Sequence, residues 1–338
     1  MIWPPSRRTI LAGAGAGFFA ATMPARASAR RFKIFMVLGR GESDNEIGFK
    51  DYFARRNISV DYVVRSTGGD PARLPAIIDE IRAVRPDLIY SWGTPQTLGL
   101  VGPLNAPDPT VFINDIPVVF TFVAAPMDAG IVASLDRPGR NVTGTIHIAP
   151  VAVQLNAILA YRPIRRLGVV YNPAERNSLL NVGALRTEAE ARGITLIEEA
   201  VPRDVTQKPS GDAVPERVAN TARRGAEMLY VGPDTFIAFT HRRTLAEAAL
   251  RARLPTFSAT ELIVRNDGAM MGLVSSSFAI GRFTAFKAAQ ILVDGMRPGD
   301  IPVETLKRFS LLINMPVARQ LDCYPPLGLL DLAEVIEG

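Results

Sequence analysis

The sequence predicts an α/β fold made of two doubly wound parallel-sheet lobes that are joined by a hinge. Short runs of consecutive apolar residues alternate with amphipathic helical stretches from Phe32 onward, and the same rhythm restarts after Pro163. The two halves also contain similar short sequences: residues 56–60 (RNISV) resemble residues 192–196 (RGITL). Continuous apolar strands between helices are typical of parallel sheets that helices cover on both faces. We therefore expect one architecture that is used twice.

In the first half, four apolar runs predict strands: Phe32–Leu38, Ser59–Val64, Leu88–Ser91 and Pro117–Phe122. Three stretches between them have the apolar spacing of helices: Glu46–Arg56, Leu74–Val84 and Pro95–Leu104. Boundary signals support these assignments. Asn57 suits a left-handed stop after the first helix, and Pro75 suits the first turn of the second helix.

The second half repeats the pattern. Its predicted strands are Arg166–Tyr171, Thr195–Ala200, Met228–Val231 and Thr256–Ala259. Its predicted helices are Ser178–Arg192, which Gly193 ends, Val214–Arg224 and Thr240–Ala252. The C-terminal part is expected to add a helix, a strand and a last helix near the end of the chain: Ala279–Asp294, Phe309–Asn314 and Leu329–Glu337.

Length and composition fit two globular domains. The chain has 338 residues, of which 48% are apolar and 21% charged, which is enough for two cores at roughly 150 residues per domain. We expect residues 1–29 to be an export signal. The first lobe should contain residues 30–147 with about 275–302, and the second should contain residues 148–274 with about 303–338. The hinge is expected within 142–150 and 268–277.

The first 29 residues have the three regions of an export signal. The pair Arg7-Arg8 precedes an apolar run from Leu11 to Met23, and the small-residue sequence Ala27-Ser28-Ala29 follows it. The arginine pair resembles a twin-arginine signal. A membrane anchor would need a run of about 20 strongly apolar residues, and this run is shorter and weaker. We expect a soluble periplasmic protein without a lipobox cysteine, because Cys323 is the single cysteine of the chain.

Removal of this segment changes the charge of the chain. The segment carries three arginines and no acid, so the formal net charge falls from +5 to +2. A chain so close to neutrality lacks electrostatic support for binding nucleic acid. We therefore expect no nucleic acid among its partners. We also expect the protein to be a monomer that binds a small molecule.

Sequence motifs for metal, cofactor and catalytic chemistry are absent. One cysteine and two distant histidines, His147 and His241, do not have the spacing of metal ligands. The chain has neither a phosphate-binding glycine-lysine loop nor a nucleophile elbow. The serine triple Ser275–Ser277 has no assignable base and fits a helix cap better than a nucleophile. We expect no metal, no cofactor and no enzymatic activity.

The loops that follow the predicted strands supply the candidate site. Ligands of open parallel sheets bind beyond the carboxyl ends of the strands, so two facing lobes would direct both sets of loops to one cleft. The loop residues suited to ligand contact are Ser43, Asp44, Trp92, Thr94, Thr121, Phe122, Asn172, Asp234, Thr235 and Glu261. Several precede helices, whose free N–H groups attract carboxylates. The set suits a small zwitterion or polar metabolite, with aromatic walls for its apolar part.

Some of these residues also have a purely structural interpretation. Asp234 could equally cap the helix that follows it. Trp92 could belong to the core instead of the cleft wall. His147, just after the apolar stretch Val142–Ile146, could be a crossover residue or a hydrogen-bonded core histidine.

The chain is similar to a known family, most clearly between residues 116 and 144. The segments Ile116–Phe120 (IPVVF), Gly130–Leu135 (GIVASL) and Arg137–Gly144 (RPGRNVTG) resemble the ABC transporter substrate-binding proteins that include the tryptophan/tyrosine-type binding proteins. The similarity covers nearly the whole chain after the signal. It implies the type I periplasmic binding protein fold, and an exported receptor that delivers a small ligand, such as an amino acid, to an ABC permease in the inner membrane.

The resemblance also implies positions for ligand contacts. They are Ser43 and Asp44, the Gly93-Thr94 loop, and the Pro233-Asp234-Thr235 loop. The chain departs from the family at Ala125, where an aspartate commonly precedes the proline. Trp92 is bulkier than usual and would narrow the pocket. Two alternative functions are an exported two-lobed α/β enzyme and a ligand-sensing domain for a membrane signalling partner.

Overall fold

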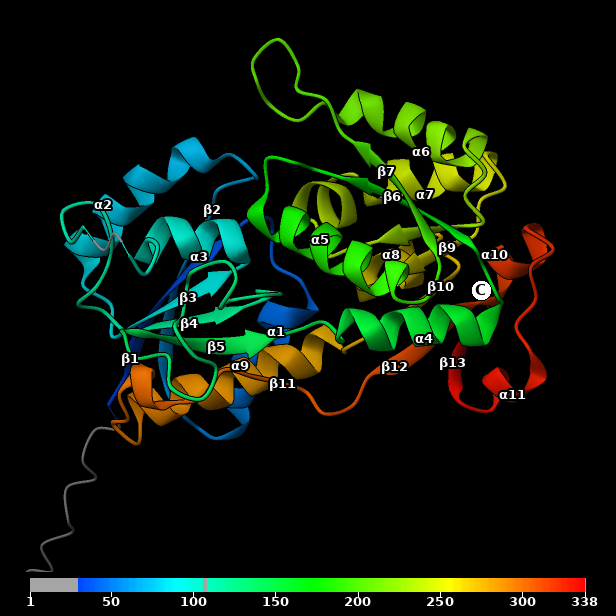
Figure 1. Cartoon of the computed structure of the whole chain (residues 1–338). Coiled ribbons are helices and arrows are strands. Elements are labelled where there is room, and N and C mark those ends of the chain that lie inside the picture. The colour runs from blue at the N-terminus through cyan, green and yellow to red at the C-terminus, as the bar shows by residue number, and fades with distance from the viewer. Residues whose placement is uncertain (1–29, 106–107, 338) are drawn as a thin grey trace, which may run out of the picture. The chain divides into compact units, whose positions relative to one another are not determined.

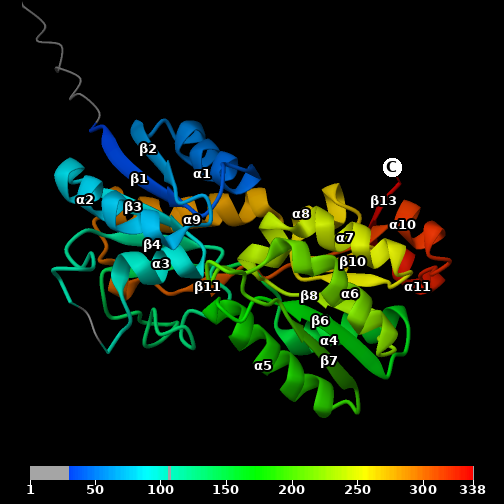
Figure 2. The ribbon, with the colours of Figure 1, turned by 90° about the horizontal axis from the view of Figure 1, so that it is seen from above.

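The computed structural model describes residues 30–105 and 108–337. The predicted export signal, residues 1–29, lies outside the described residues. The described strands form two sheets (Figures 1 and 2), and we call each sheet with the helices packed on it a lobe. Over the same residues, no helix combines the length and the apolar character that crossing a bilayer requires.

The first sheet, as far as the structure describes the chain, has six parallel strands in the order β2-β1-β3-β4-β5-β11. They are β1 (Phe32–Leu38), β2 (Val60–Ser66), β3 (Leu88–Trp92), β4 (Val118–Thr121), β5 (Val142–Ile146) and β11 (Glu304–Thr305). The helices packed on them are α1 (Asp44–Arg55), α2 (Leu74–Val84), α3 (Thr94–Val101) and α9 (Ser277–Leu292). Strand β11 lies past the lobe boundary expected near residue 302.

Alternate residues of β1 are buried on opposite faces of the first sheet. Ile34 and Met36 belong to a cluster with α1 and α9, whereas Phe35 and Val37 belong to a cluster with α2 and α3. Figure 1 shows the same division, with α2 and α3 on one side of the strands and α1 and α9 on the other. Both faces are therefore covered, as the continuous apolar runs predict.

The second sheet has the order β7-β6-β8-β9-β10-β12-β13 within the described residues, and β12 runs antiparallel to β10. Its strands are β6 (Arg166–Tyr171), β7 (Thr195–Ala200), β8 (Met228–Val231), β9 (Thr256–Ser258), β10 (Met271–Val274), β12 (Ser310–Asn314) and β13 (Ala333–Ile336). Side chains of α4 (Val151–Tyr161) and α5 (Arg176–Glu190) pack in one cluster, and side chains of α6 (Val214–Arg223), α7 (Arg242–Arg251) and α8 (Glu261–Asn266) in another. Two short helices follow near the end of the chain: α10 (Met315–Gln320) and α11 (Leu327–Leu330).

Both lobes share one strand order. In each, the second strand lies outside the first and the next three follow on the other side, as in doubly wound folds. The predicted fold class is confirmed. The bounds of β1, β6, β7, β8 and α2 agree with the predicted ranges residue for residue.

The last predicted helix, Leu329–Glu337, is wrong. Residues Ala333–Ile336 form β13, which pairs in parallel with β12, and only the short α11 precedes it. Apolar spacing over so short a run suits either a helix or a strand. The free edge of β12 provides hydrogen-bond partners that no local sequence pattern reveals.

Over the residues that the structure describes, the chain passes between the two sheets three times. Residues 147–150 lead from β5 to α4, residues 275–276 lead from β10 to α9, and residues 306–309 lead from β11 to β12. An antiparallel bridge between Ile148 and Val274 joins the first two crossings. The expected hinge segments contain these two crossings and omit the third.

The segment Arg137–Gly144, which is part of the family resemblance, forms hydrogen bonds that connect loops of the first lobe. The Arg140 guanidinium donates a hydrogen bond to the carbonyl of Gly102 at 3.0 Å. Asn141 Nδ2 donates to the carbonyl of Ile116 at 2.8 Å. The Asn141 carbonyl accepts from the main-chain N–H at the start of β4. These contacts lie at the amino ends of the strands, so the motif supports the sheet at the end opposite the candidate site.

Candidate ligand-binding site

A cavity of about 660 Å³ lies between the lobes. Residues that line it come from segments 68–73 and 94–98 of the first lobe and from segments 172–177 and 235–240 of the second. These segments follow the carboxyl ends of β2, β3, β6 and β8. Ligands of parallel sheets bind at this edge, and the volume suits a small metabolite.

The first-lobe wall includes the N-terminus of α3. Gly93 precedes this helix with a φ of +85°, and no side chain caps it. Thr94, the first helical residue, is only 2% exposed, and its hydroxyl has no hydrogen-bond partner among the described residues. Free N–H groups at a helix N-terminus attract anions. Together with the Thr94 hydroxyl they form a receptor suited to a carboxylate.

Two amide side chains on the cavity wall have unpaired oxygens. Gln96 Nε2 donates to the Thr67 hydroxyl at 3.1 Å, and Asn177 Nδ2 donates to the carbonyl of Pro233 at 2.6 Å. Gln96 Oε1 and Asn177 Oδ1 are buried, and neither has a partner within the described part of the chain. Such oxygens accept from N–H groups. Both oxygens lie behind the surface of the cavity, so a ligand would reach them only after the wall moves.

Five charged side chains line the cavity: Asp70, Arg73, Glu175, Arg176 and Lys208. Glu175 is fixed by its own lobe, since its carboxylate accepts from the N–H groups of Thr235 at 2.9 Å and Phe236 at 2.8 Å. Arg176 reaches the other lobe and donates to the carbonyl of Asp128 at 2.8 Å. The wall therefore combines charged groups of both signs with a larger apolar surface, and some of the charged groups also connect the lobes.

Asp234 joins the loops of the second-lobe wall. Its carboxylate accepts from the main-chain N–H groups of Asn172 and Ile237, both at 2.7 Å, and from the Ser178 hydroxyl at 2.6 Å. Burial, and then the nearby charge of Glu175, raise its pKa to about 7, although these hydrogen bonds act in the opposite direction. The capping interpretation of Asp234 is thus observed. With both oxygens occupied, Asp234 positions the wall of the cavity.

An aromatic stack surrounds Trp92, the last residue of β3. The rings of Trp92 and Phe122 stack with centroids 5.5 Å apart, and Phe122 stacks on His147 at 4.3 Å. Phe239 from the second lobe meets Trp92 edge-on at 5.0 Å. The guanidinium of Arg40 lies 4.4 Å from the centre of the Trp92 ring. The stack therefore contains rings from both lobes, and Trp92 belongs at once to the core and to the interface between the lobes.

His147 is not a hydrogen-bonded core histidine. It is 5% exposed, and neither ring nitrogen has a partner among the described residues. Burial lowers its pKa to about 3, so the ring is neutral near pH 7. Phe122, whose ring stacks on that of His147, has a φ of +55°. Backbone strain of this kind in a bulky residue is concentrated at functional sites.

The structure brings some of the ten predicted contact residues together and separates others. Thr94, Asn172 and Thr235 line the cavity, while Trp92 and Phe122 lie in the stack and Asp234 braces the loops. The remaining four have other surroundings. Ser43 caps α1, and Asp44 is exposed in its first turn. The Thr121 hydroxyl accepts from Thr145, and Glu261 accepts from the Ser277 N–H and from Arg265.

Sequence reasoning missed the loops after β2 and β7, which bring Asp70 and Lys208 to the cavity. It also missed Gln96 and Asn177. The strand order contained a usable signal, since the second strand of a doubly wound sheet also ends at the ligand-binding edge. The residues Gly68-Gly69, one residue after the end of β2, mark that loop.

Comparisons with known proteins relate this chain to one family and to structures of similar fold. Residues 42–335 match the model of a family described as ABC transporter substrate binding protein. The tyrosine-binding protein of Clostridioides difficile (strain R20291) is 27% identical over 276 residues, which cover 81% of this chain and 73% of that protein. A conserved domain protein of Vibrio cholerae has a similar structure, with a TM-score of 0.80 and 26% identity over 90% of this chain and 99% of that chain. An ABC domain from Streptococcus pneumonia in complex with L-Trp has a TM-score of 0.75 and 23% identity over 90% of this chain and 100% of that chain.

Proposed function

Because this chain belongs to the family of ABC transporter substrate-binding proteins, we propose that it binds an amino acid, or a small zwitterion of similar chemistry, between its lobes. The relative from Clostridioides difficile is named a tyrosine-binding protein, and the similar structure from Streptococcus pneumonia contains L-Trp. Both names support an amino acid as the class of ligand for this chain.

One observation carries the proposal. Three residues that line the cavity each carry a buried polar atom without a partner among the described residues: Thr94 Oγ1, Gln96 Oε1 and Asn177 Oδ1. Unsatisfied buried polar atoms cost about 1–3 kcal/mol each. A hydroxyl beside a helix N-terminus and two amide oxygens complement a carboxylate and an ammonium. A bound amino acid would satisfy these groups once a movement of the wall brings them to the surface of the cavity.

The arrangement also supports closure around the ligand. Thr94 and Gln96 belong to the first lobe, whereas Asn177 belongs to the second. A ligand shifts an equilibrium between open and closed forms only if it binds them with different affinity. A compound that touches both walls has this property, because only the closed form supplies both sets of contacts.

We also propose that the protein is exported through a twin-arginine signal in residues 1–29 and works in the periplasm. There the closed form would dock on an ABC permease of the inner membrane. A monomer without enzymatic activity, cofactor or metal suffices for this role. The charge sequence of residues 1–29 and the family membership of the remaining chain support the proposal.

A ligand screen tests the proposed function. Mass spectrometry of compounds that co-purify with the full chain should detect an amino acid or a close analogue. Thermal unfolding with each amino acid should then show a specific rise in the melting temperature, since a ligand at one hundred times its Kd stabilises by about 2.7 kcal/mol. Calorimetric titration should give one site per chain. Conversion of the bound compound into a product, or no stabilisation by any zwitterion, would contradict the proposal.

A further inference from the structure

The cavity between the lobes combines a mostly apolar surface with charged side chains of both signs. Its apolar lining residues include Pro71, Pro95, Leu98, Pro209 and Phe236. Charges beside apolar walls interact more strongly than charges on an open surface, because less water screens them. The charge that the protein leaves unpaired in this cavity therefore bears on the kind of ligand that binds there.

The two acidic residues of the wall are engaged by groups of the protein. Asp70 pairs with Lys208 at 3.3 Å and also accepts from the N–H of Ala72 at 3.0 Å. The Glu175 carboxylate accepts from two main-chain N–H groups of the second lobe and from Nδ2 of Asn172 at 3.2 Å. Within the described part of the chain, no other acidic side chain lines the cavity. Neither carboxylate is therefore free to neutralise a further cation.

Two arginines of the wall have no acidic partner. Arg73 lies just before α2 in the first lobe, and Arg176 is the first residue of α5 in the second. Arg176 donates to a neutral group, the carbonyl of Asp128, at 2.8 Å and 3.3 Å. Among the described residues, neither guanidinium forms an ion pair, whereas Lys208 does. The cavity therefore carries an excess of positive charge.

The position of these arginines on opposite lobes links this charge to closure. Two like charges repel each other more as the lobes approach, so without a ligand they oppose the closed form. An anionic group between them is attracted to both, and the attraction is strongest when the lobes are closest. A ligand with such a group binds the closed form more tightly than the open form, and this difference is what shifts the equilibrium between them.

We infer that the ligand is an amino acid with a second acidic group, which lies between Arg73 and Arg176 while the carbon skeleton packs on the apolar surface. The inference rests on the proposed function and narrows its substrate class to acidic amino acids. The two arginines are the specificity-determining residues, because they select the charge of the ligand. A neutral amide of the same shape would keep the apolar contacts and lose the attraction.

Calorimetric titrations of the full chain test this preference. The ligands are the natural amino acids together with 4-carboxy-L-phenylalanine and 4-carbamoyl-L-phenylalanine. Three pairs in this panel compare an acid with its amide: L-aspartate with L-asparagine, L-glutamate with L-glutamine, and the two phenylalanine derivatives. The tightest ligand should be an acid, and it should bind at least tenfold more tightly than its amide.

The outcomes separate the inference from the proposed function. A tightest ligand that is neutral or cationic, or an acid that binds less than tenfold more tightly than its amide, would overturn the inference and leave the proposed function in place. A folded chain that binds no compound of the panel would overturn the proposed function, and the inference with it. Thermal unfolding of the same sample shows whether the chain is folded.

Substitution of the two arginines tests their role. Arg73→Gln and Arg176→Gln should each reduce the preference for the acid over its amide at least threefold, while the affinity for the amide stays within twofold of the wild type. Both side chains are exposed, so we expect both variants to fold. Arg176→Lys should keep part of the preference, because it keeps the charge. An unchanged preference in both glutamine variants would overturn the inference.

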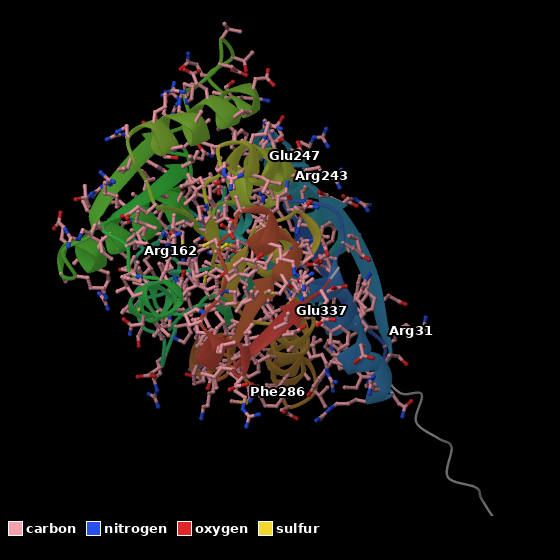
Figure 3. All side chains as sticks on the ribbon, turned by 90° about the vertical axis from the view of Figure 1, so that its right-hand side faces the viewer. Arg31, Arg162, Arg243, Glu247, Phe286 and Glu337 are labelled. Carbon is pink, nitrogen blue, oxygen red and sulfur yellow. The ribbon has the colours of Figure 1, made fainter. Side chains whose placement is uncertain are left out.

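Arg31→Gln is the matched control, because it removes the same charge at a distance from the cavity. Arg31 directly precedes β1, at the amino edge of the first sheet, and its side chain is 67% exposed. Figure 3 shows Arg31 on the outside of the molecule. This variant should keep the wild-type preference. A loss as large as that in Arg176→Gln would mean that the net charge of the chain sets the preference, which would overturn the inference.

Salt dependence gives a readout that needs no variant. In about 1 M salt the Debye length is only about 3 Å, so the attraction of the arginines for the acidic group should weaken. Relative to about 0.05 M salt, the affinity for the acid should fall at least threefold more than the affinity for its amide. An equal fall for both compounds would show that charge does not set the preference, and would overturn the inference.

Discussion

The Nζ atom of Lys208 lies 3.3 Å from Oδ2 of Asp70, and this ion pair joins the two lobes beside the cavity. Lys208 lies in the loop after β7, and Asp70 lies in the loop after β2. The N–H of Ala72 contributes most to lowering the pKa of Asp70, and the hydrogen bond from Lys208 acts in the same direction. Two loops that sequence reasoning left out therefore meet at the candidate site.

Asp70→Asn should speed ligand release without abolishing binding. Both side chains are substantially exposed, and exposed ion pairs contribute little because solvent screens them. We expect the dissociation rate to rise by less than about fivefold. Stopped-flow fluorescence of Trp92 can measure that rate. The difference from the wild type should disappear in about 1 M salt, where the Debye length is only about 3 Å.

A control variant separates this contact from a general charge effect. Asp79→Asn removes a carboxylate whose nearest cation, Arg82, lies 3.9 Å away on the same helix α2. That variant should release ligand at the wild-type rate. Equal rates for Asp70→Asn and wild type at low salt would contradict a role for the Lys208 pair in holding the lobes.

Thr94→Val should weaken ligand binding while the fold stays intact. The valine keeps the shape of the side chain and removes the hydroxyl that has no partner among the described residues. A hydrogen bond to a carboxylate is worth about 1.5–3 kcal/mol, so affinity should fall by about 10- to 100-fold. Calorimetric titration measures this change, and urea unfolding checks stability. Thr187→Val, at an exposed position on α5, is the matched control. An unaltered Kd would remove Thr94 from the site.

The sequence predicted the fold well where structure is determined locally. The run Phe32–Leu38 is apolar throughout because both faces of the first sheet are covered, and its strand has the predicted bounds. The four-residue strand Ala333–Ile336 was mistaken for a helix, because only pairing with β12 fixes its structure. Helix α4 (Val151–Tyr161) was not assigned at all. Its apolar residues lie nearly all round, so the sequence has little helical periodicity.

The site was harder to predict, because it depends on contacts between distant segments. Thr94 could be predicted because the Gly-Thr sequence follows a predicted strand. The unpaired oxygen of Asn177 could not be predicted, since it results from the hydrogen bond that its amide nitrogen donates to the carbonyl of Pro233. The place of Phe239 depends on the approach of the second lobe to Trp92. No periodicity in the sequence encodes that distance.

The pKa of Asp234 predicts a pH-dependent stability. Its folded-state value of about 7 exceeds the ordinary value of 3.8. Between about pH 4 and pH 7 the folded chain keeps a proton that the unfolded chain loses, so this group lowers the free energy of unfolding as pH rises. Asp234→Asn should abolish the contribution, which urea unfolding across that range measures. In Glu175→Gln the decline should end at a lower pH, because the Glu175 charge helps to raise the pKa. A Glu175→Gln profile identical to that of the wild type would contradict this coupling.

His147 predicts the opposite dependence. Its pKa is about 3 in the folded chain and 6.5 ordinarily, so the unfolded chain takes up a proton below about pH 6.5 that the folded chain does not. Stability from this group is present above pH 6.5 and is lost as pH falls. His147→Phe should remove that loss, and at pH 7 it should raise the free energy of unfolding by about 1 kcal/mol, because two unpaired buried nitrogens disappear. Reduced stability at pH 7 and an unchanged acid profile would show that His147 is solvated.

Gly281→Ala should be strongly destabilising because helices α1 and α9 touch through their backbones. A Cβ at Gly281 would overlap the carbonyl oxygen of Asn45 on α1, and a Cβ at Gly48 would overlap the carbonyl oxygen of Phe278 on α9. The added methyl must separate the helices, at a cost of about 3 kcal/mol. In Gly183→Ala, within α5, nothing beyond the neighbouring backbone of the same helix lies within 4 Å of the new Cβ, so better helix propensity should stabilise by about 0.5–1 kcal/mol. Urea unfolding of both variants decides the matter. Effects of the same sign and size would mean that α1 and α9 do not pack this closely.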